Sequence, residues 1–408
     1  MTVVHFVRMR PLIGFIVLYA AMYSAFGVAS PFWPMFFQSR GLSPQQLGTL
    51  LALGTLARLV VGPIIGRIAD RIQNLRAVLA TCTALAVVSA VGLLPEQGYF
   101  LLLAIALCQA ATLAPITTIS DALAISLATD TRRKTFEYGW VRGTGSAAFV
   151  VGTLLAGQLL SQNVGLSAIV WVHAALLSGA IIGAALIPGV LIPAEIFESV
   201  DTNVAAGSFL ELLRNPVFRL VIAISALVFG SHAMHDAFAV IRWSAAGISP
   251  ITTSLLWSEA VVSEVLVFFL IGPLVVNRFG PRGAAALAAI AGIVRWTVMS
   301  QTTDVAAFAL VQPLHGCTFA LLHLSCMRLI GFSVSRRLAA TAQSIYAFGS
   351  AIASAALTYL SGILYEQFGA AGFLAMALLC TLAIPIALIL PRAQIPSTED
   401  IAKQHPLP

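Results

Sequence analysis

Three ionisable side chains lie inside apolar stretches in the second half of this chain. Glu264 lies in the run 264–271, Arg295 in the run 292–299 and His315 in the run 311–316. Each run is too apolar to be anything but part of a membrane span, and a charge at the bilayer centre costs at least about 2.5 kcal/mol unless it is paired or faces water. An acid, a base and an imidazole on three successive helices therefore predict a proton-coupling site.

Another interpretation of these residues stays open, namely an ion pair that only holds helices together. Two further residues are candidates for the same coupling role. Glu259 precedes Glu264 by five residues, about 140° around the helix, so both carboxyls do not face one cavity equally well. His323 follows His315 at about 80° around the helix and could line the same cavity.

Two arginines in the first half are candidates for substrate binding. Arg142 lies at the start of the fifth apolar stretch, and its planar guanidinium suits a carboxylate of the substrate or of the protein. Asp121 in the fourth stretch is its natural partner, so a plain Asp121–Arg142 ion pair is the alternative. Arg58 lies in the middle of the second stretch, where an anionic substrate, backbone carbonyls or a neighbouring acid are its possible partners.

His232, His235 and Asp236 share one face of the seventh stretch, because their spacing is i, i+3 and i+4. Such residues ligate metals, but a single helix contributes and no second cluster is visible, so we expect no metal or cofactor. Two interpretations remain. His232 and Asp236 could contact a proton or the substrate, or the residues form a polar patch that packs helices together.

Tyr19, Tyr23 and Phe26 form an aromatic stripe along the first stretch, with Trp33 beyond it. Such stripes more often pack than bind, but on a helix that borders a central cavity this one would offer a stacking surface to an aromatic ligand. The sequence has no Walker loop, nucleophile elbow or zinc-binding helix. An ATP-driven pump and a membrane hydrolase are therefore not expected, and the chain is not predicted to be an enzyme.

Composition sets the class of protein. Of 408 residues, 59% are hydrophobic and only 9% are charged, with a mean hydropathy of +0.95. A soluble protein would carry roughly 25% charged residues, so this is a polytopic helical membrane protein. The five cysteines lie within apolar stretches, in no metal-binding or CxxC pattern.

The chain contains twelve apolar stretches of the length that one bilayer crossing needs, about 20 residues. They are expected at 11–37, 45–67, 75–94, 99–127, 138–161, 167–187, 217–242, 251–276, 283–301, 304–331, 337–364 and 369–390. A polar piece over 188–216 separates six from six. We therefore expect an all-α membrane protein with an N-terminal half over 1–187, a linker, a C-terminal half over 217–392 and a tail over 393–408.

The distribution of Lys and Arg predicts the orientation in the membrane. Most of them fall on the side of the termini and the linker: Arg8, Arg10, Arg67, Arg71, Arg76, Arg132, Arg133, Lys134, Arg214, Arg219, Arg278, Arg282, Arg336, Arg337, Arg392 and Lys403. Little beyond Arg40 and Arg242 lies on the other side. Both termini and the linker are thus expected to be cytoplasmic, in a bacterial inner membrane. The net charge of +6 reflects this topology, and no nucleic-acid partner is expected.

The two halves repeat one loop. The segment 62–71 closes the second stretch and 272–280 closes the eighth, both beginning with Gly-Pro. The first resembles the loop signature of the major facilitator superfamily, and the candidate conformational residues are Gly66, Asp70, Arg71, Asn277 and Arg278. A substrate site at the midplane between two repeats is the usual plan of such transporters.

More specific resemblance covers about residues 12–390. The segment 136–146, with Arg142, resembles the start of the fifth helix in the lactose permease family, where this arginine binds substrate. The phenylpropionate permease family is closer, through Ser30-Pro-Phe-Trp33, Ala57-Arg58, Asp121-Ala-Leu, Tyr138-Gly139, 145–149, Ser231-His232-Ala, Leu256-Trp257-Ser, Val294-Arg295-Trp296, His323-Leu and Met327-Arg328. The resemblance adds Trp257 to the candidates for substrate binding.

One departure concerns proton coupling. In the lactose permease family an acid follows the histidine of the tenth helix by three positions and carries the proton, but here that position is Thr318. The lysine of the eleventh helix also has no equivalent between Arg337 and Glu366. Glu264 is then the expected proton carrier.

These observations predict a secondary active transporter, most simply a monomer, that imports a small organic acid with protons by alternating access. An aromatic acid is implied by the resemblance. Protonation of Glu264 would break a pair with Arg295 and favour one orientation. A sugar or nucleoside symporter is the main alternative. An efflux antiporter would resemble its family through a fifth helix rich in glycine and proline, but 143–157 contains no proline, which disfavours this class. A non-transporting sensor is disfavoured because it would gain nothing from charges inside the membrane.

Overall fold

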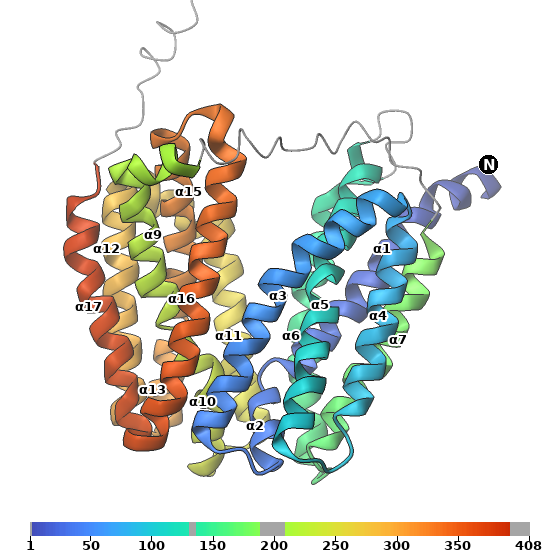
Figure 1. The fold of residues 1–408 in the computed structure, drawn as a ribbon, viewed down its shortest axis with the longest axis horizontal. Helices are drawn as coiled ribbons and strands as arrows, with labels where there is room; N and C mark the ends of the chain where they lie inside the picture. Colours follow the sequence, from blue (N-terminus) through green and yellow to red (C-terminus); the bar gives the residue numbers. More distant parts are fainter. Residues whose placement is uncertain (1, 130–135, 188–208, 392–408) are drawn as a thin grey trace, which may run out of the picture.

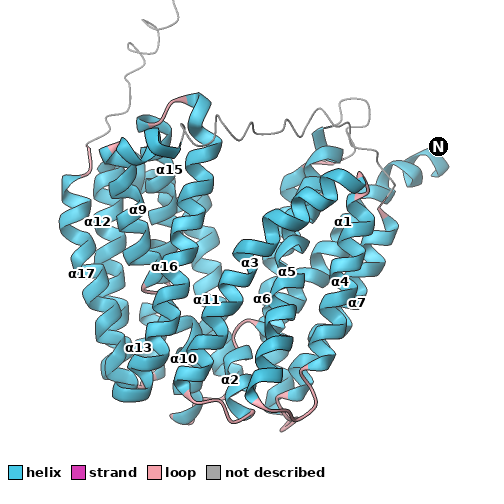
Figure 2. Cartoon of the chain, viewed as in Figure 1, coloured by secondary structure: helices cyan, strands magenta, loops and turns pink. Residues whose placement is uncertain are grey.

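The computed structural model describes residues 2–129, 136–187 and 209–391, and every regular element in these ranges is a helix (Figure 2). The N-terminal half contains α1 (Thr2–Ala29), α2 (Trp33–Ser39), α3 (Pro44–Ile72), α4 (Leu75–Gly92), α5 (Tyr99–Thr129), α6 (Tyr138–Ser161) and α7 (Ser167–Leu186). The C-terminal half contains α9 (Pro216–Gly230), α10 (Ala233–Ala245), α11 (Pro250–Leu266), η2 (Val267–Ile271), α12 (Gly272–Gln301), α13 (Val305–Val311), α14 (Leu314–Gly316), η3 (Cys317–Leu321), α15 (Leu322–Ser333), η4 (Arg336–Leu338), α16 (Ala339–Phe368), η5 (Gly369–Gly372) and α17 (Phe373–Ile389). The predicted tail over 393–408 and the predicted linker up to residue 208 lie outside the described residues.

Ten stretches of the described chain are long and apolar enough to cross a membrane, and two of them are over twice the necessary length. Pro250–Gln301 reverses direction at Gly280, where φ is 70° and ψ is 170°. Arg336–Ile389 reverses near Gly369, where φ is 54°. Glycine adopts these left-handed conformations without steric penalty. Each long stretch therefore crosses twice, and the twelve predicted spans in two six-helix halves are confirmed.

The first predicted span, 11–37, is broken in the structure. Helix α1 ends at Ala29 and α2 begins at Trp33, because Pro31 has no N–H to continue the helix and Pro34 lies in the first turn of α2. Helix α3 extends past the predicted end at residue 67 to Ile72, where Gln73 adopts a left-handed φ of 53°.

Glycines allow close helix packing inside the N-terminal half. Helix α1 packs against α6 and α7. A Cβ at Gly152 of α6 would overlap the backbone of Ser24, and one at Gly183 of α7 would overlap the backbone of Leu18. Close approach through small residues is how helices associate in membranes, where lipid and side chains are equally apolar.

The two halves meet at one end of the molecule and separate toward the other (Figure 1). Helix α3 packs on α16, and α6 packs on α11. A Cβ on Gly48 would lie 2.8 Å from the Cα of Gly362, and a Cβ on Gly157 would overlap Ser254. These contacts lie at the same end of the molecule as α2 and α10, and we call it the closed end. The opposite end is the open end.

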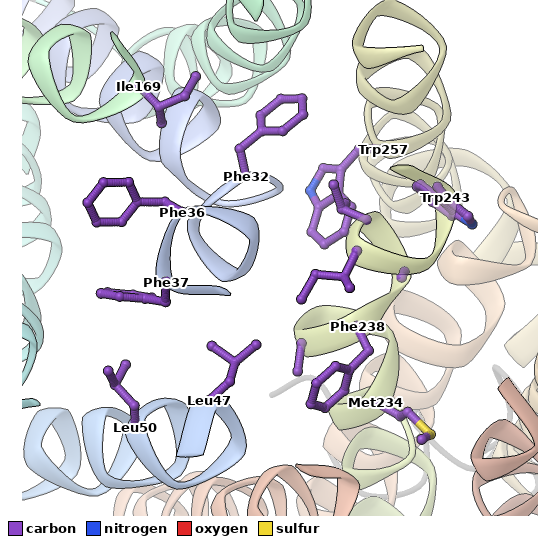
Figure 3. Close-up of a cluster of buried hydrophobic side chains, with 14 of the residues drawn as sticks. Phe32, Phe36, Phe37, Leu47, Leu50, Ile169, Met234, Phe238, Trp243 and Trp257 are labelled. Carbon is purple, nitrogen blue, oxygen red and sulfur yellow. The ribbon is translucent and has the colours of Figure 1, made fainter. Parts of the chain in front are cut away.

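Large apolar side chains fill the interface at the closed end. Phe32 and Leu47 of the N-terminal half lie opposite Trp257, Phe238 and Met234 of the C-terminal half (Figure 3). These five residues are at most 8% exposed. The cluster separates water at the closed end from the space between the halves. A site between the halves therefore lies between this cluster and the open end.

Candidate functional site

A cavity of about 1070 Å³ lies between the two halves. Helices α1, α2, α3, α5, α6 and α7 line it on one side and α10 and α16 on the other. Its aromatic residues are Phe26, Trp33, Phe37 and Phe149. Its ionisable residues are Arg58, His173 and Asp236. A largely apolar cavity with a few polar groups is the usual form of a small-molecule site.

Arg58 is a cation in this cavity that has no polar partner among the described residues. Its side chain is exposed to the cavity from the middle of α3, and it makes no hydrogen bond or ion pair with any residue that the structure describes. The neighbouring acid that the sequence left open as a partner is therefore not found there. Arg58 can receive a carboxylate of a bound molecule through two parallel N–H donors.

Arg142 and Asp121 do not form the ion pair considered from the sequence. Asp121 accepts hydrogen bonds from the hydroxyls of Tyr19 and Tyr138, the latter at 2.9 Å. Arg142 instead donates to the hydroxyl of Tyr23, and its guanidinium lies 5.1 Å from the centre of that ring. The tyrosines thus lie between the acid and the base. None of these five residues lines the cavity.

A neutral polar group on the wall of the N-terminal half was not expected from the sequence. His173 of α7 donates from Nδ1 to the carbonyl of Ala25 at 2.9 Å, and its Nε2 accepts from the amide of Gln109 at 3.1 Å. The ring of His173 lies 5.4 Å from that of Trp33. These contacts fix the side chains of Gln109 and Trp33 at the cavity wall.

In the C-terminal half, His315 lies between Glu264 and Arg295. Its Nδ1 is 3.1 Å from Nη1 of Arg295, and its Nε2 is 3.4 Å from Oε2 of Glu264. Arginine only donates hydrogen bonds, so Nδ1 accepts and the ring proton is on Nε2, toward the carboxylate. The direct Glu264–Arg295 pair of the prediction is replaced by a pair bridged by an imidazole.

Arg295 is fully buried and has a second set of partners. Gln312 accepts from its Nε at 3.3 Å and from its Nη2 at 2.9 Å. The amide oxygen of Gln312 therefore faces Arg295, and its amide nitrogen donates to Nε2 of His235 at 3.3 Å. Nη2 of Arg295 lies 3.4 Å from the same atom of His235, whose Nδ1–H must point to Oδ1 of Asp236 at 3.1 Å.

Aromatic rings enclose this network. The guanidinium of Arg295 lies 4.5 Å from the centre of the Trp296 ring. Trp257, a candidate for substrate binding, is buried and stacks on His235 with ring centres 5.1 Å apart. His232 is buried 5.0 Å from the ring of His315 and is not among the residues that line the cavity. Of the predicted face of the seventh span, only Asp236 reaches the cavity.

The helices that carry Glu264 and His315 both widen just beyond these residues. The π-helical segment η2 follows Glu264 at residue 267, and η3 follows His315 at residue 317. The backbone N–H of Gly316 donates to Oγ of Ser263 at 3.2 Å, where the two helices touch. π-Helical turns often occur at functional sites.

Two further candidates for proton coupling, His323 and Glu259, make no hydrogen bond to this network in the described part of the chain. Oη of Tyr346 is 3.4 Å from Nδ1 of His323, and the His323 ring is near enough to Glu264 for an electrostatic interaction. Glu259 has no hydrogen bond or ion pair within the described ranges. Thr318 is buried, and its hydroxyl donates to the carbonyls of Leu314 and His315, so it does not substitute for the missing acid.

The predicted conformational loops lie at the open end. Gly66 lines the cavity, whereas Asp70 and Arg71 are exposed at the end of α3 without an ion pair in the described part of the chain. In the repeat, Asn277 accepts from Arg328 at 2.7 Å. Arg278 lies over the ring of Phe279, 5.8 Å from its centre.

Comparisons with known proteins agree with this architecture. The profile of the MFS_1 like family matches residues 12–375. An Escherichia coli (strain K12) protein named "Probable 3-phenylpropionic acid transporter" is 31% identical over 389 residues, which cover 93% of this chain and 97% of that protein.

Two solved structures share the fold at low sequence identity. The nucleoside transporter NupG has a TM-score of 0.80 at 14% identity, over 92% of this chain and 97% of that chain. A D-xylose–proton symporter has a TM-score of 0.67 at 14% identity, over 96% of this chain and all of that chain (100%). The chain belongs to the MFS_1-like family, and is an integral membrane transporter of the major facilitator type and not an enzyme.

Proposed function

We propose that this transporter imports a small organic acid, with an aromatic acid favoured, together with protons. The observation that carries the proposal is Arg58, a cation without a partner among the described residues, in a cavity otherwise lined mainly by apolar and aromatic groups. The aromatic residues Trp33 and Phe26 line the same cavity. The relative named for 3-phenylpropionic acid transport supports the same class of solute.

The solute would cross by alternating access between the two halves. We infer from the distribution of Lys and Arg that the open end faces the cytoplasm, with both termini on that side of a bacterial inner membrane. The described conformation would then be inward-facing, with the apolar cluster around Phe238 and Trp257 closing the outer side. Return to the outward-facing form requires the contacts of Gly48 and Gly157 to separate.

Coupling to protons is assigned to the group formed by Glu264, His315 and Arg295. Protonation of Glu264 removes the charge that His315 bridges to Arg295. A buried arginine that loses its counter-charge is destabilised by several kcal/mol, so protonation favours a conformation in which Arg295 has other partners. A proton thereby changes the relative stability of the two orientations.

A nucleoside or sugar symporter is the second candidate. The cavity also contains Asp236, whose carboxylate oxygens suit hydroxyl groups, and its aromatic rings suit a base or a sugar face. A neutral solute of this kind would leave Arg58 without a counter-charge.

A screen by thermal unfolding distinguishes these candidates. Purified protein is exposed to 3-phenylpropionate, its amide, nucleosides and monosaccharides, since a ligand that binds the folded state raises its stability by mass action. The proposal expects stabilisation by the acid and little by its amide. Uptake of labelled acid into proteoliposomes by counterflow then tests transport. Stabilisation by a nucleoside or sugar alone would contradict the proposed substrate class.

A further inference from the structure

One hydrogen-bonded chain of side chains joins the wall of the cavity to Glu264. It begins at Asp236, whose side chain is 60% exposed, and passes through His235, Arg295 and His315. The four contacts along it measure 3.1, 3.4, 3.1 and 3.4 Å. Asp236 is the only carboxyl group among the described residues that line the cavity. Thus one acidic end of the chain faces the solute, and the other lies on α11.

Arg295 prevents this chain from conducting protons. Its guanidinium stays protonated in proteins and only donates hydrogen bonds. His235 and His315 each present an acceptor nitrogen to it, so neither ring carries a second proton. A proton that reaches Asp236 therefore cannot pass to Glu264. The two carboxyls influence each other through charge and hydrogen bonding instead.

Arg58 at the cavity wall and the charged members of this chain form a group whose charges cancel when the cavity is empty. Arg58 and Arg295 are the cations, and ionised Asp236 and Glu264 are the anions. Five imidazoles lie near these groups and are counted as neutral, because each has a ring nitrogen that accepts a hydrogen bond or has no hydrogen-bond partner among the described residues: His173, His232, His235, His315 and His323, the last of which interacts electrostatically with Glu264. Asp121 and Arg142 form a separate group in the N-terminal half, with one charge of each sign.

We propose that an organic anion entering the cavity causes this group to take up one proton, on Asp236 or Glu264, so that anion and proton cross together without net charge. This inference rests on the proposed function, because it requires the solute to be an anion. A carboxylate bound at Arg58 adds one negative charge to a group whose charges cancel. Enclosing an uncompensated charge costs several kcal/mol once both ends close around it, and one proton removes that cost.

Removal of either carboxyl is expected to have the same result, although only Asp236 faces the cavity. In Asp236→Asn the empty group has one excess positive charge, and the anion itself cancels it. Binding then requires no proton. The same reasoning applies to Glu264→Gln. Two carboxyls that act independently would instead give a loss of proton uptake in only one of the two variants.

The first measurement counts protons taken up when 3-phenylpropionate saturates the purified protein in weakly buffered solution with a pH indicator. Above about pH 6 the free acid is already ionised, so any uptake is by the protein. Wild type is expected to take up about one proton per bound anion, and both variants about none. Glu96→Gln, which removes an exposed carboxyl from the loop between α4 and α5, is the control and should match wild type. Uptake by Asp236→Asn equal to wild type, or no uptake by wild type, would overturn the proposal.

The second measurement uses the protein without ligand, so that failure of the proposed substrate does not decide it. Infrared difference spectra at pH 7 compare wild type with each variant. Both substitutions should remove an ionised carboxylate band and no protonated carboxyl band. Loss of a protonated band in either variant would show that the empty group already holds a proton, and would refute the charge cancellation. Absence of 3-phenylpropionate binding alone would refute only the proposed substrate.

Discussion

Glu366 of α16 accepts a hydrogen bond from the backbone N–H of Gln45, in the first turn of α3, at 2.9 Å. The same carboxylate lies 3.5 Å from Oγ of Ser43, the N-cap of that helix. A negative charge at a helix N-terminus is stabilising because the first N–H groups have no partners within the helix. Here the acid and the helix belong to different halves, so the contact holds the closed end together.

Glu366→Gln should therefore favour opening of the closed end. The interaction of an exposed carboxylate with a helix N-terminus is worth about 0.3–1 kcal/mol, so the ratio of the two orientations should change roughly two- to fivefold. Spin labels at Gln38 of α2 and Ala246 beyond α10, both exposed, would report this as a larger population of long distances. An unchanged distance distribution would mean that the contact of Glu366 does not contribute to closure.

Gly157→Leu should prevent closure and stop transport. A side chain at Gly157 would overlap Ser254 of α11, so α6 and α11 could no longer meet. Counterflow of labelled acid should fall to background, while ligand binding measured by thermal unfolding persists. Gly143→Leu on the same helix is the matched control, since a Cβ there meets nothing within 4 Å. Normal counterflow by Gly157→Leu would contradict the role given to this contact.

The sequence predicted the parts of this site whose burial is energetically costly. Glu264, Arg295 and His315 are conspicuous because an ionisable group in an apolar span requires a partner or water. Their arrangement was less predictable, since three residues on three helices can pair in several ways, and only packing puts His315 in the middle. Tyr23 likewise takes the place of an acid beside Arg142. Its position in an aromatic stripe indicated packing or stacking, not a hydrogen bond to an arginine.

Neutral polar residues were missed for a related reason. Gln312 and Gln109 carry no charge, so their presence in an apolar stretch predicts little, yet Gln312 fixes the proton position of His235. The π-helical segments after Glu264 and His315 have no signal in the hydrophobic pattern. By contrast, the twelve spans follow directly from apolar length, and only the break after Ala29 needed the positions of the prolines.

Glu264→Gln should abolish accumulation of solute driven by a pH gradient, while exchange across the membrane remains measurable. Exchange needs only the solute-bound form to reorient, and accumulation needs the proton site as well. The measurement compares uptake into proteoliposomes with and without an imposed gradient, beside exchange of internal for external solute. Gradient-driven uptake at the wild-type level would show that Glu264 is not required for coupling.

The last prediction concerns Arg58, the residue on which the class of substrate depends. Arg58→Gln keeps a polar side chain but removes the positive charge that we expect to meet a carboxylate. A hydrogen bond to a charged group contributes about 1.5–3 kcal/mol, so affinity for 3-phenylpropionate should fall roughly ten- to a hundredfold. Affinity for 3-phenylpropionamide, which stacks on the same rings without a charge, should change far less. Arg142→Gln removes a cation of the N-terminal half that does not line the cavity. It tests whether any loss of positive charge in that half has the same effect. Equal losses for acid and amide in Arg58→Gln would indicate that Arg58 supports the fold of the cavity, and would favour a neutral solute such as a nucleoside or sugar.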